Sequence, residues 1–191
     1  MTPHAPRPAP RAITRIFKDI ISAIMKSPQT GFRMLMKKYQ ELVYWHIRRM
    51  VVLHDDAQDA TQETFIRIYK SLEQCRDSES FRSWIYRIAT NEALRAIGRR
   101  RNEMVSMDSE STGASLIKAD EYVDYDDIMG VNFQKAILAL PPKQQLAFNL
   151  RYYDDMSFDE IAKVAGSTAA SAKVNYHIAK EKITKYMKSI N

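Results

Sequence analysis

Cysteine, glycine and long apolar runs are all scarce in this sequence of 191 residues. The single cysteine, Cys75, excludes an intramolecular disulfide and favours a reducing compartment. No apolar run reaches the roughly 18 residues that a membrane span needs. Residues 1–10 lack the apolar stretch of a signal peptide. We therefore expect a cytoplasmic protein.

Features of catalytic and cofactor sites are scarce too. The histidines His4, His46, His54 and His177 fall in different segments, and no metal-ligand spacing connects them with Cys75. The five glycines form no loop that could cradle a phosphate. A redox-sensing thiol at Cys75 remains an alternative to an incidental loop cysteine. We predict no enzyme activity, no cofactor, no metal site and no small-molecule substrate.

Charge is distributed unevenly along the chain. Residues 1–101 contain 19 Lys and Arg against 10 Asp and Glu, residues 102–130 contain 1 against 8, and residues 131–191 contain 9 against 5. The acidic stretch has few large apolar residues, which is typical of a flexible linker, although a long loop inside one domain is an alternative. The two basic blocks suit a polyanionic partner. We predict two small domains joined by an acidic linker.

Helical periodicity runs through both basic blocks, and no alternating strand pattern or Asn-Gly turn occurs. Residues 1–11 contain four prolines and are expected to be disordered. In the helix expected from residue 55, the apolar spacing places Tyr69 on the inward face. We predict an all-α fold with helices over residues 13–24, 32–47, 55–72, 80–101, 133–140 and 143–153.

The C-terminal segment has the pattern of a helix-turn-helix. Ser157 and Glu160 form a capping box, Gly166 permits a tight turn, and Thr168 can cap the next helix. A basic second helix of this motif enters the DNA major groove, and a plain helical hairpin with a solvated lysine face is the alternative. The predicted inward face consists of Ala172, Tyr176, Ala179 and Ile183, and the outward face of Ser171, Lys173, Asn175, His177 and Lys180.

Residues 134–187, with PPKQQLAFNLRYYDDMSFDEIAKVAG and the basic helix that follows, resemble region 4 of the sigma-70 family of RNA polymerase sigma factors. DDAQDATQETFIRIYKSL resembles that family's region 2 helix, which docks on the polymerase clamp. FRSWIYRIATNEALRAIGRRR resembles the helix that melts and reads the promoter's minus-ten element. Regions 3 and 1.1 of larger members have no room, so the chain is identified as a member of the extracytoplasmic-function subgroup. Asn175 and Ile178 depart from the family, which usually has arginine at both positions.

The resemblance implies a role for three groups of residues. Those for core polymerase binding are Asp55, Asp56, Asp59, Gln62 and Glu63. Those for minus-ten DNA are Gln74, Arg76, Asp77, Ser78, Phe81, Arg82, Trp84, Tyr86, Arg87, Arg95, Arg99 and Arg100. Those for minus-thirty-five DNA are Ser171, Lys173, Asn175, His177 and Lys180. Each group has a competing structural interpretation. The acids could be surface charge that compensates the helix dipole, Trp84 could pack in the core, and Arg99 to Arg101 could form a solubilising C-terminal turn.

The predicted organisation is a disordered tail at 1–11, sigma region 2 at 12–101, an acidic linker at 102–130 and sigma region 4 at 131–191. The resemblance implies core RNA polymerase, promoter DNA and an anti-sigma factor as partners. The alternative is a stand-alone helix-turn-helix regulator in which residues 1–101 form a dimerisation domain. The acidic and aromatic features of the first block distinguish the two, because a lone repressor does not need them.

Overall fold

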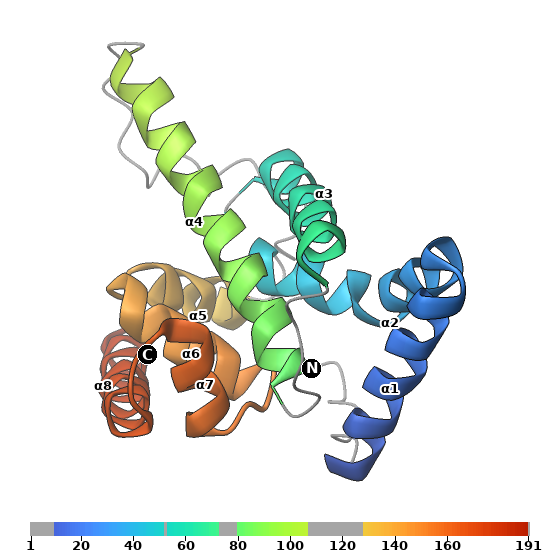
Figure 1. Ribbon diagram of the computed structural model, residues 1–191. Helices are drawn as coiled ribbons and strands as arrows, with labels where there is room; N and C mark the ends of the chain where they lie inside the picture. The colour runs from blue at the N-terminus through green and yellow to red at the C-terminus, as the bar shows by residue number, and fades with distance from the viewer. Residues whose placement is uncertain (1–9, 52, 73–79, 107–127, 191) are drawn as a thin grey trace.

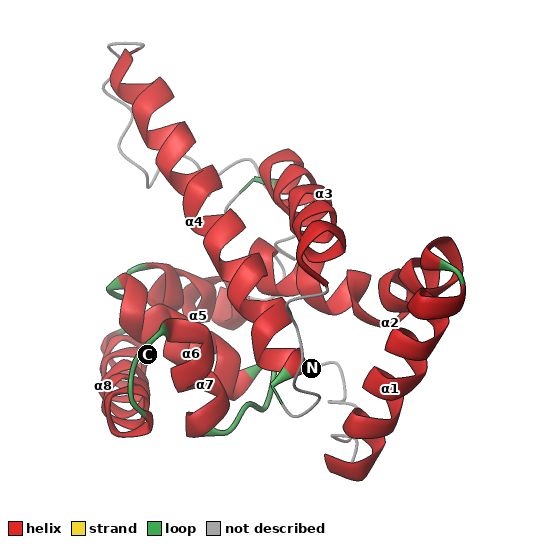
Figure 2. Cartoon of the chain, viewed as in Figure 1, coloured by secondary structure: helices red, strands yellow, loops and turns green. Residues whose placement is uncertain are grey.

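A computed structural model describes residues 10–51, 53–72, 80–106 and 128–190 of the chain. Within these ranges all regular structure is helical, which confirms the predicted all-α fold (Figures 1 and 2). The helices are α1 (Pro10–Lys26), α2 (Pro28–Arg48), α3 (His54–Ser71), α4 (Phe81–Ser106), α5 (Ile128–Leu138), α6 (Pro142–Tyr152), α7 (Phe158–Ala165) and α8 (Ala169–Ser189).

Helix ends follow the local capping chemistry. The Ser157 hydroxyl accepts a hydrogen bond from the Glu160 backbone N–H, and the Glu160 carboxylate accepts one from the Ser157 N–H, which completes the predicted capping box of α7. Gly166 ends α7 at φ 60°, a left-handed conformation that glycine adopts without strain. Thr168 caps α8 by accepting a hydrogen bond from the Ser171 N–H, as predicted.

Several expected limits differ from the structure. Helix α1 begins at Pro10, inside the segment expected to be disordered, because proline is tolerated at a helix start where no N–H donor is needed. Helix α4 continues to Ser106 and α5 begins at Ile128, so both ends of the expected linker are helical. Tyr69, expected to face inward, is half exposed. Residues 1–9 and 107–127 lie outside the described residues.

The two halves of the chain pack together. One core cluster joins α2, α3 and α4 to side chains of the C-terminal half, among them Leu150, Met156 and Ile161. A second cluster lies within the C-terminal half, where α5, α6 and α8 bury Ile137, Phe148 and other apolar side chains. Helix α7 lies against the beginning of α4, whose C-terminal end projects beyond the other helices (Figure 1). This packing places the helix-turn-helix beside the helix predicted to open DNA.

Candidate nucleic-acid and polymerase interface

Helix α3 divides the predicted polymerase-binding residues into two kinds. Its apolar face, which includes Ala57 and Phe65, is buried. The opposite side exposes the side chains of Asp55, Asp59, Gln62 and Glu63. Asp56 differs because it is half-buried and its Oδ2 lies 3.0 Å from Nη1 of Arg100 on α4. The four exposed side chains form one polar surface, whereas the Asp56 side chain connects α3 to α4.

The aromatic side chains at the start of α4 are mostly core residues. Phe81 and Tyr86 are fully buried. The Phe81 ring packs edge-on against Tyr39 of α2, with 5.8 Å between ring centroids. Trp84 is half-buried and stacks on Phe81 with centroids 5.9 Å apart. In this conformation the rings of Phe81 and Tyr86 pack against side chains of α2, and their contact with unstacked bases stays a prediction.

The arginines along α4 have different surroundings. Arg87 and Arg99 are exposed. Arg95 forms an ion pair with the buried Glu92 carboxylate, which also pairs with Arg67 of α3. Arg100 is the partner of Asp56, as described above. Of the predicted minus-ten residues, Gln74, Arg76, Asp77 and Ser78 lie outside the described residues, as does Cys75.

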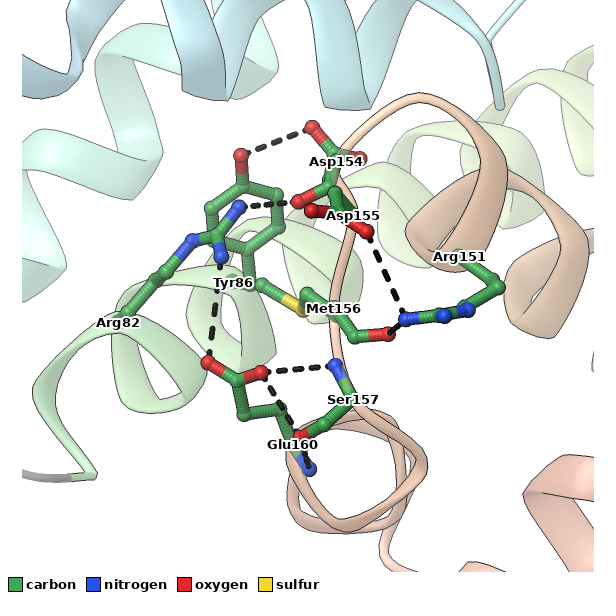
Figure 3. Close-up of polar contacts among 8 residues, drawn as sticks. All are labelled: Arg82, Tyr86, Arg151, Asp154, Asp155, Met156, Ser157 and Glu160. Carbon is green, nitrogen blue, oxygen red and sulfur yellow. Dashed lines mark hydrogen bonds and ion pairs between the residues drawn. The ribbon is translucent and has the colours of Figure 1, made fainter. Parts of the chain in front are cut away.

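A buried acid in the loop between α6 and α7 connects the two halves of the chain (Figure 3). The Asp154 side chain is 4% exposed. Tyr86 donates a hydrogen bond of 2.9 Å to its Oδ1, and Arg49 donates one of 3.3 Å to its Oδ2. His46 Nδ1 lies 3.8 Å from the same Oδ2. The Asp154 backbone carbonyl accepts a hydrogen bond from Arg82. We call these five residues the Asp154 cluster.

The electrostatics of the Asp154 cluster favour a charged carboxylate. Burial alone would raise the pKa of Asp154, but the hydrogen bond and charge of His46, the charge of Arg49 and the Tyr86 hydroxyl lower it below its ordinary value of 3.8. Burial, followed by the negative charge of Asp154, raises the pKa of Tyr86 well above its ordinary value of 10.0. The tyrosine therefore stays protonated as a donor while the aspartate stays ionised.

Two further contacts join α4 to α7. Glu160, which caps α7, also places its Oε1 3.9 Å from Nη1 of Arg82 (Figure 3). Lys163 Nζ donates a hydrogen bond of 2.8 Å to the Ser80 hydroxyl. Arg82, a predicted minus-ten residue, is thus engaged by both the α6–α7 loop and α7. Within this conformation the beginning of α4 is covered by the C-terminal half.

Sequence reasoning missed the Asp154 cluster. Its one local signal is the place of His46, which follows Leu35, Tyr39 and Val43 on the apolar face of α2. A histidine on a buried face needs a polar partner, but nothing in the sequence identifies that partner as an aspartate in the other half of the chain. The cluster is assembled only when the α6–α7 loop packs against α2 and α4.

Helix α8 presents the predicted recognition surface. Ser171, Lys173, His177 and Lys180 are exposed. Asn175 is half-buried, and its amide donates hydrogen bonds to the Ser171 carbonyl and hydroxyl oxygens at 2.9 and 3.3 Å. The predicted inward residues Ala172, Ala179 and Ile183 are buried, and Tyr176 is half-buried against both core clusters. Val174 and Ile178 are exposed and were not among the predicted site residues.

Among the described residues, no three His, Cys, Asp or Glu side chains come together in a group that could hold a metal ion. None of the helices in the described ranges combines the length and the hydropathy that crossing a membrane requires.

Comparison with known proteins identifies two matched segments. Residues 35–103 match the family Sigma-70 region 2, and residues 131–183 match the family Sigma-70, region 4. The first segment covers most of α2, all of α3 and most of α4, and the second covers most of α5, all of α6 and α7 and most of α8. One matched segment therefore falls on each of the two basic halves of the sequence.

Similar proteins extend over most of the chain. The ECF RNA polymerase sigma factor SigW of Bacillus subtilis is 27% identical over 185 residues, covering 92% of this chain and 98% of that protein. The ECF RNA polymerase sigma-E factor of Escherichia coli is 29% identical over 174 residues, covering 86% and 90%.

Two solved structures share the fold. The sigma factor RpoE in complex with the anti-sigma factor NepR from Bartonella quintana has a TM-score of 0.68 at 19% identity, covering 82% of this chain and 96% of that chain. CnrH in complex with the cytosolic domain of CnrY has a TM-score of 0.67 at 18% identity, covering 94% and 99%.

Proposed function

This chain belongs to the extracytoplasmic-function subgroup of the sigma-70 family, and from that membership we propose how its two halves divide the work of starting transcription. It is a sigma factor that directs promoter-specific transcription initiation by RNA polymerase. Sigma factors are not themselves catalytic, and we propose the same for this chain. The observation that carries the proposal is the pair of region matches, one on each basic half and in the family's order.

Core polymerase binding is assigned to the exposed polar surface of α3. Asp55, Asp59, Gln62 and Glu63 point away from the buried face of the helix, where a partner can reach them. The resemblance to the sigma-70 family implies that the partner is a coiled coil of the polymerase that carries basic residues. Exposed ion pairs are individually weak, so the affinity arises from several of them together.

The experiment is a binding assay with core polymerase. The triple variant Asp59→Ala, Gln62→Ala, Glu63→Ala should weaken the one-to-one complex while leaving helicity unchanged. The matched control is Asp19→Ala, Gln40→Ala, Glu41→Ala, which removes the same three side-chain types from exposed positions on α1 and α2. Equal loss of binding in both variants, or loss of the fold in the first, would refute the assignment.

DNA contact is divided between the halves. We assign minus-ten reading to the segment between α3 and α4, with the exposed Arg87 and Arg99 on the duplex phosphates. We assign minus-thirty-five reading to the exposed face of α8, including Lys173 and His177. A stand-alone regulator would instead protect a DNA site without polymerase, and a footprint with and without core polymerase separates the two functions.

The two promoter elements lie two to three turns of DNA apart, about 70–110 Å at roughly 34–36 Å per turn. In the arrangement described here, which we call the closed arrangement, α7 contacts the beginning of α4. One chain cannot then hold both elements at once. We infer that the halves separate at the Asp154 cluster when the chain joins polymerase and promoter.

A reversible cross-link tests this opening. The Lys163 side chain reaches Ser80 across the two halves. A direct disulfide needs Cα atoms within about 7 Å, so Ser80→Cys and Lys163→Cys in a Cys75→Ser background are joined instead by a short bis-maleimide that contains a cleavable disulfide and keeps the chain closed. The cross-linked protein should fail to initiate from a promoter that the same protein uses after the cross-link is reduced. Equal initiation by both forms would show that the halves need not separate.

An anti-sigma factor is a further expected partner. The two solved structures that share this fold carry titles describing a sigma factor with the anti-sigma factor NepR and CnrH with the cytosolic domain of CnrY. We propose that this chain is likewise held by an anti-sigma factor until a signal releases it, and that it acts in the cytoplasm.

A further inference from the structure

The recognition helix α8 exposes apolar side chains on the side that faces away from the core. Val174 is 56% exposed and Ile178 is 37% exposed. They lie one helical turn apart, and the buried side of α8 is formed by Ala172, Ala179 and Ile183. With 3.6 residues per turn, Val174 lies almost opposite that buried side. It therefore occupies the centre of the exposed face.

Neither folding nor helix stability accounts for a valine at this position. A β-branched side chain slightly weakens a helix, and an exposed one buries little surface in return. Position 174 is also the sixth residue of α8, within the first two turns, which are the part of a recognition helix that reaches base edges. The position is thus suited to a contact that forms only when DNA is bound.

The side chains next to Val174 leave few hydrogen-bond donors for the bases. The Asn175 amide is already bonded to the carbonyl and hydroxyl oxygens of Ser171. Ile178, one helical turn from Val174, adds a second exposed apolar side chain and no hydrogen-bond donor. Lys173 and His177 flank the apolar side chains and suit phosphates on one side of the groove. Apolar contact is therefore the chemistry that the centre of this face offers.

We infer that Val174 lies against the 5-methyl group of a thymine in the major groove of the minus-thirty-five element and makes the chain thymine-selective at that base pair. Apolar side chains recognise thymine in this way, because the methyl group distinguishes its edge from those of the other bases. The inference rests on the proposed function of α8. A protein partner fits less well, since this apolar strip is far smaller than the roughly 800 Å² per partner of a stable protein interface and has basic neighbours.

Deoxyuridine provides a direct probe, since it keeps every hydrogen-bonding group of thymine and lacks only the methyl. Holoenzyme assembled from core polymerase and the full chain is bound to promoter duplexes in which each minus-thirty-five thymine, on either strand, is replaced in turn. One position should lose affinity by about fourfold, the effect of burying one methyl group. With Val174→Ala, thymine and uracil at that position should bind equally.

The matched control is Ile190→Ala, which removes another exposed apolar side chain at the C-cap of α8 and should keep the uracil penalty. The inference would be overturned if the uracil penalty persisted in Val174→Ala, or if the unaltered chain showed no penalty at any thymine. In either case, protection of the minus-thirty-five element would still support the proposed function. Absence of that protection would overturn both. Weaker anti-sigma binding by Val174→Ala with unchanged DNA binding would assign the strip to a protein partner instead.

Discussion

Replacing Asp154 with asparagine removes one negative charge from the contact between the two halves while leaving the shape of the side chain nearly unchanged. The hydroxyl of Tyr86 can still donate to the asparagine oxygen. Arg49 and His46 lose the charge that they face at 3.3 and 3.8 Å. We therefore expect Asp154→Asn to shift the chain from the closed arrangement towards separated halves.

The size of the shift follows from the contacts that are lost. A hydrogen bond to a charged group contributes about 1.5–3 kcal/mol. Arg49 is 20% exposed, so water compensates part of its loss, and the Tyr86 bond persists. The net effect should be about 2 kcal/mol, which changes the ratio of closed to open molecules about 30-fold.

Energy transfer between two dyes measures this ratio. Lys70 and Lys188 are both exposed, one on α3 and one on α8, so dyes on Lys70→Cys and Lys188→Cys in a Cys75→Ser background report the separation of the halves. Asp154→Asn should lower the transfer efficiency of the free chain. The matched control is Asp155→Asn, which removes the same charge from the adjacent residue. The Asp155 side chain is 47% exposed, and its Oδ1 lies 3.6 Å from Nη1 of Arg151 in the same half of the chain. Equal transfer in both variants would refute the role of the Asp154 cluster as the closing contact.

Three other outcomes are expected. The Asp154 carboxylate has a lowered pKa in the folded chain, so its stabilising contribution should be complete above its ordinary pKa of 3.8 and be lost as the pH falls through the lower folded-state pKa. The difference in unfolding free energy between the unaltered chain and Asp154→Asn should then persist down to about pH 4 and shrink below; a difference that disappears near pH 6 would contradict the assignment. Gly31→Ala should destabilise the chain by about 1–3 kcal/mol in urea, because its Cβ would lie 2.2 Å from Ile24 Cγ1 and 2.4 Å from the Ile24 nitrogen. Gly98→Ala, with no atom within 4 Å of the new Cβ, should instead be neutral or stabilise by up to about 1 kcal/mol, and similar values for the two would contradict this packing. Lys173→Ala with Lys180→Ala should reduce the slope of holoenzyme–promoter affinity against salt by about 2, and an unchanged slope would remove both lysines from the phosphate contacts.

Local physics explains which features could be predicted from the sequence. The capping box at Ser157, the turn at Gly166 and the cap at Thr168 depend on residues within a few positions of each other, and all three occur as expected. Helix periodicity likewise predicted the buried side of α8. Helix limits were less accurate where no capping residue marks the end, as at Ser106 of α4.

Features that depend on the packing of distant segments could not be predicted. Tyr86 and Asp154 are 68 positions apart, and Arg49 and Asp154 are 105 apart. The residue type alone also does not show whether an aromatic side chain contacts a base or packs in the core, because the same ring can do either. Phe81 is buried against α2, a fact that its neighbours in the sequence do not reveal.

A sigma factor gives core RNA polymerase its promoter specificity, and transcription of genomic DNA tests directly whether this chain does so. Fragmented genomic DNA is transcribed by core polymerase alone and by core polymerase with the chain, and the 5′ ends of the RNA are sequenced. We expect start sites that depend on the chain and share two upstream motifs about two to three turns of DNA apart. The absence of such start sites, together with a specific DNA footprint by the chain alone, would contradict this expectation.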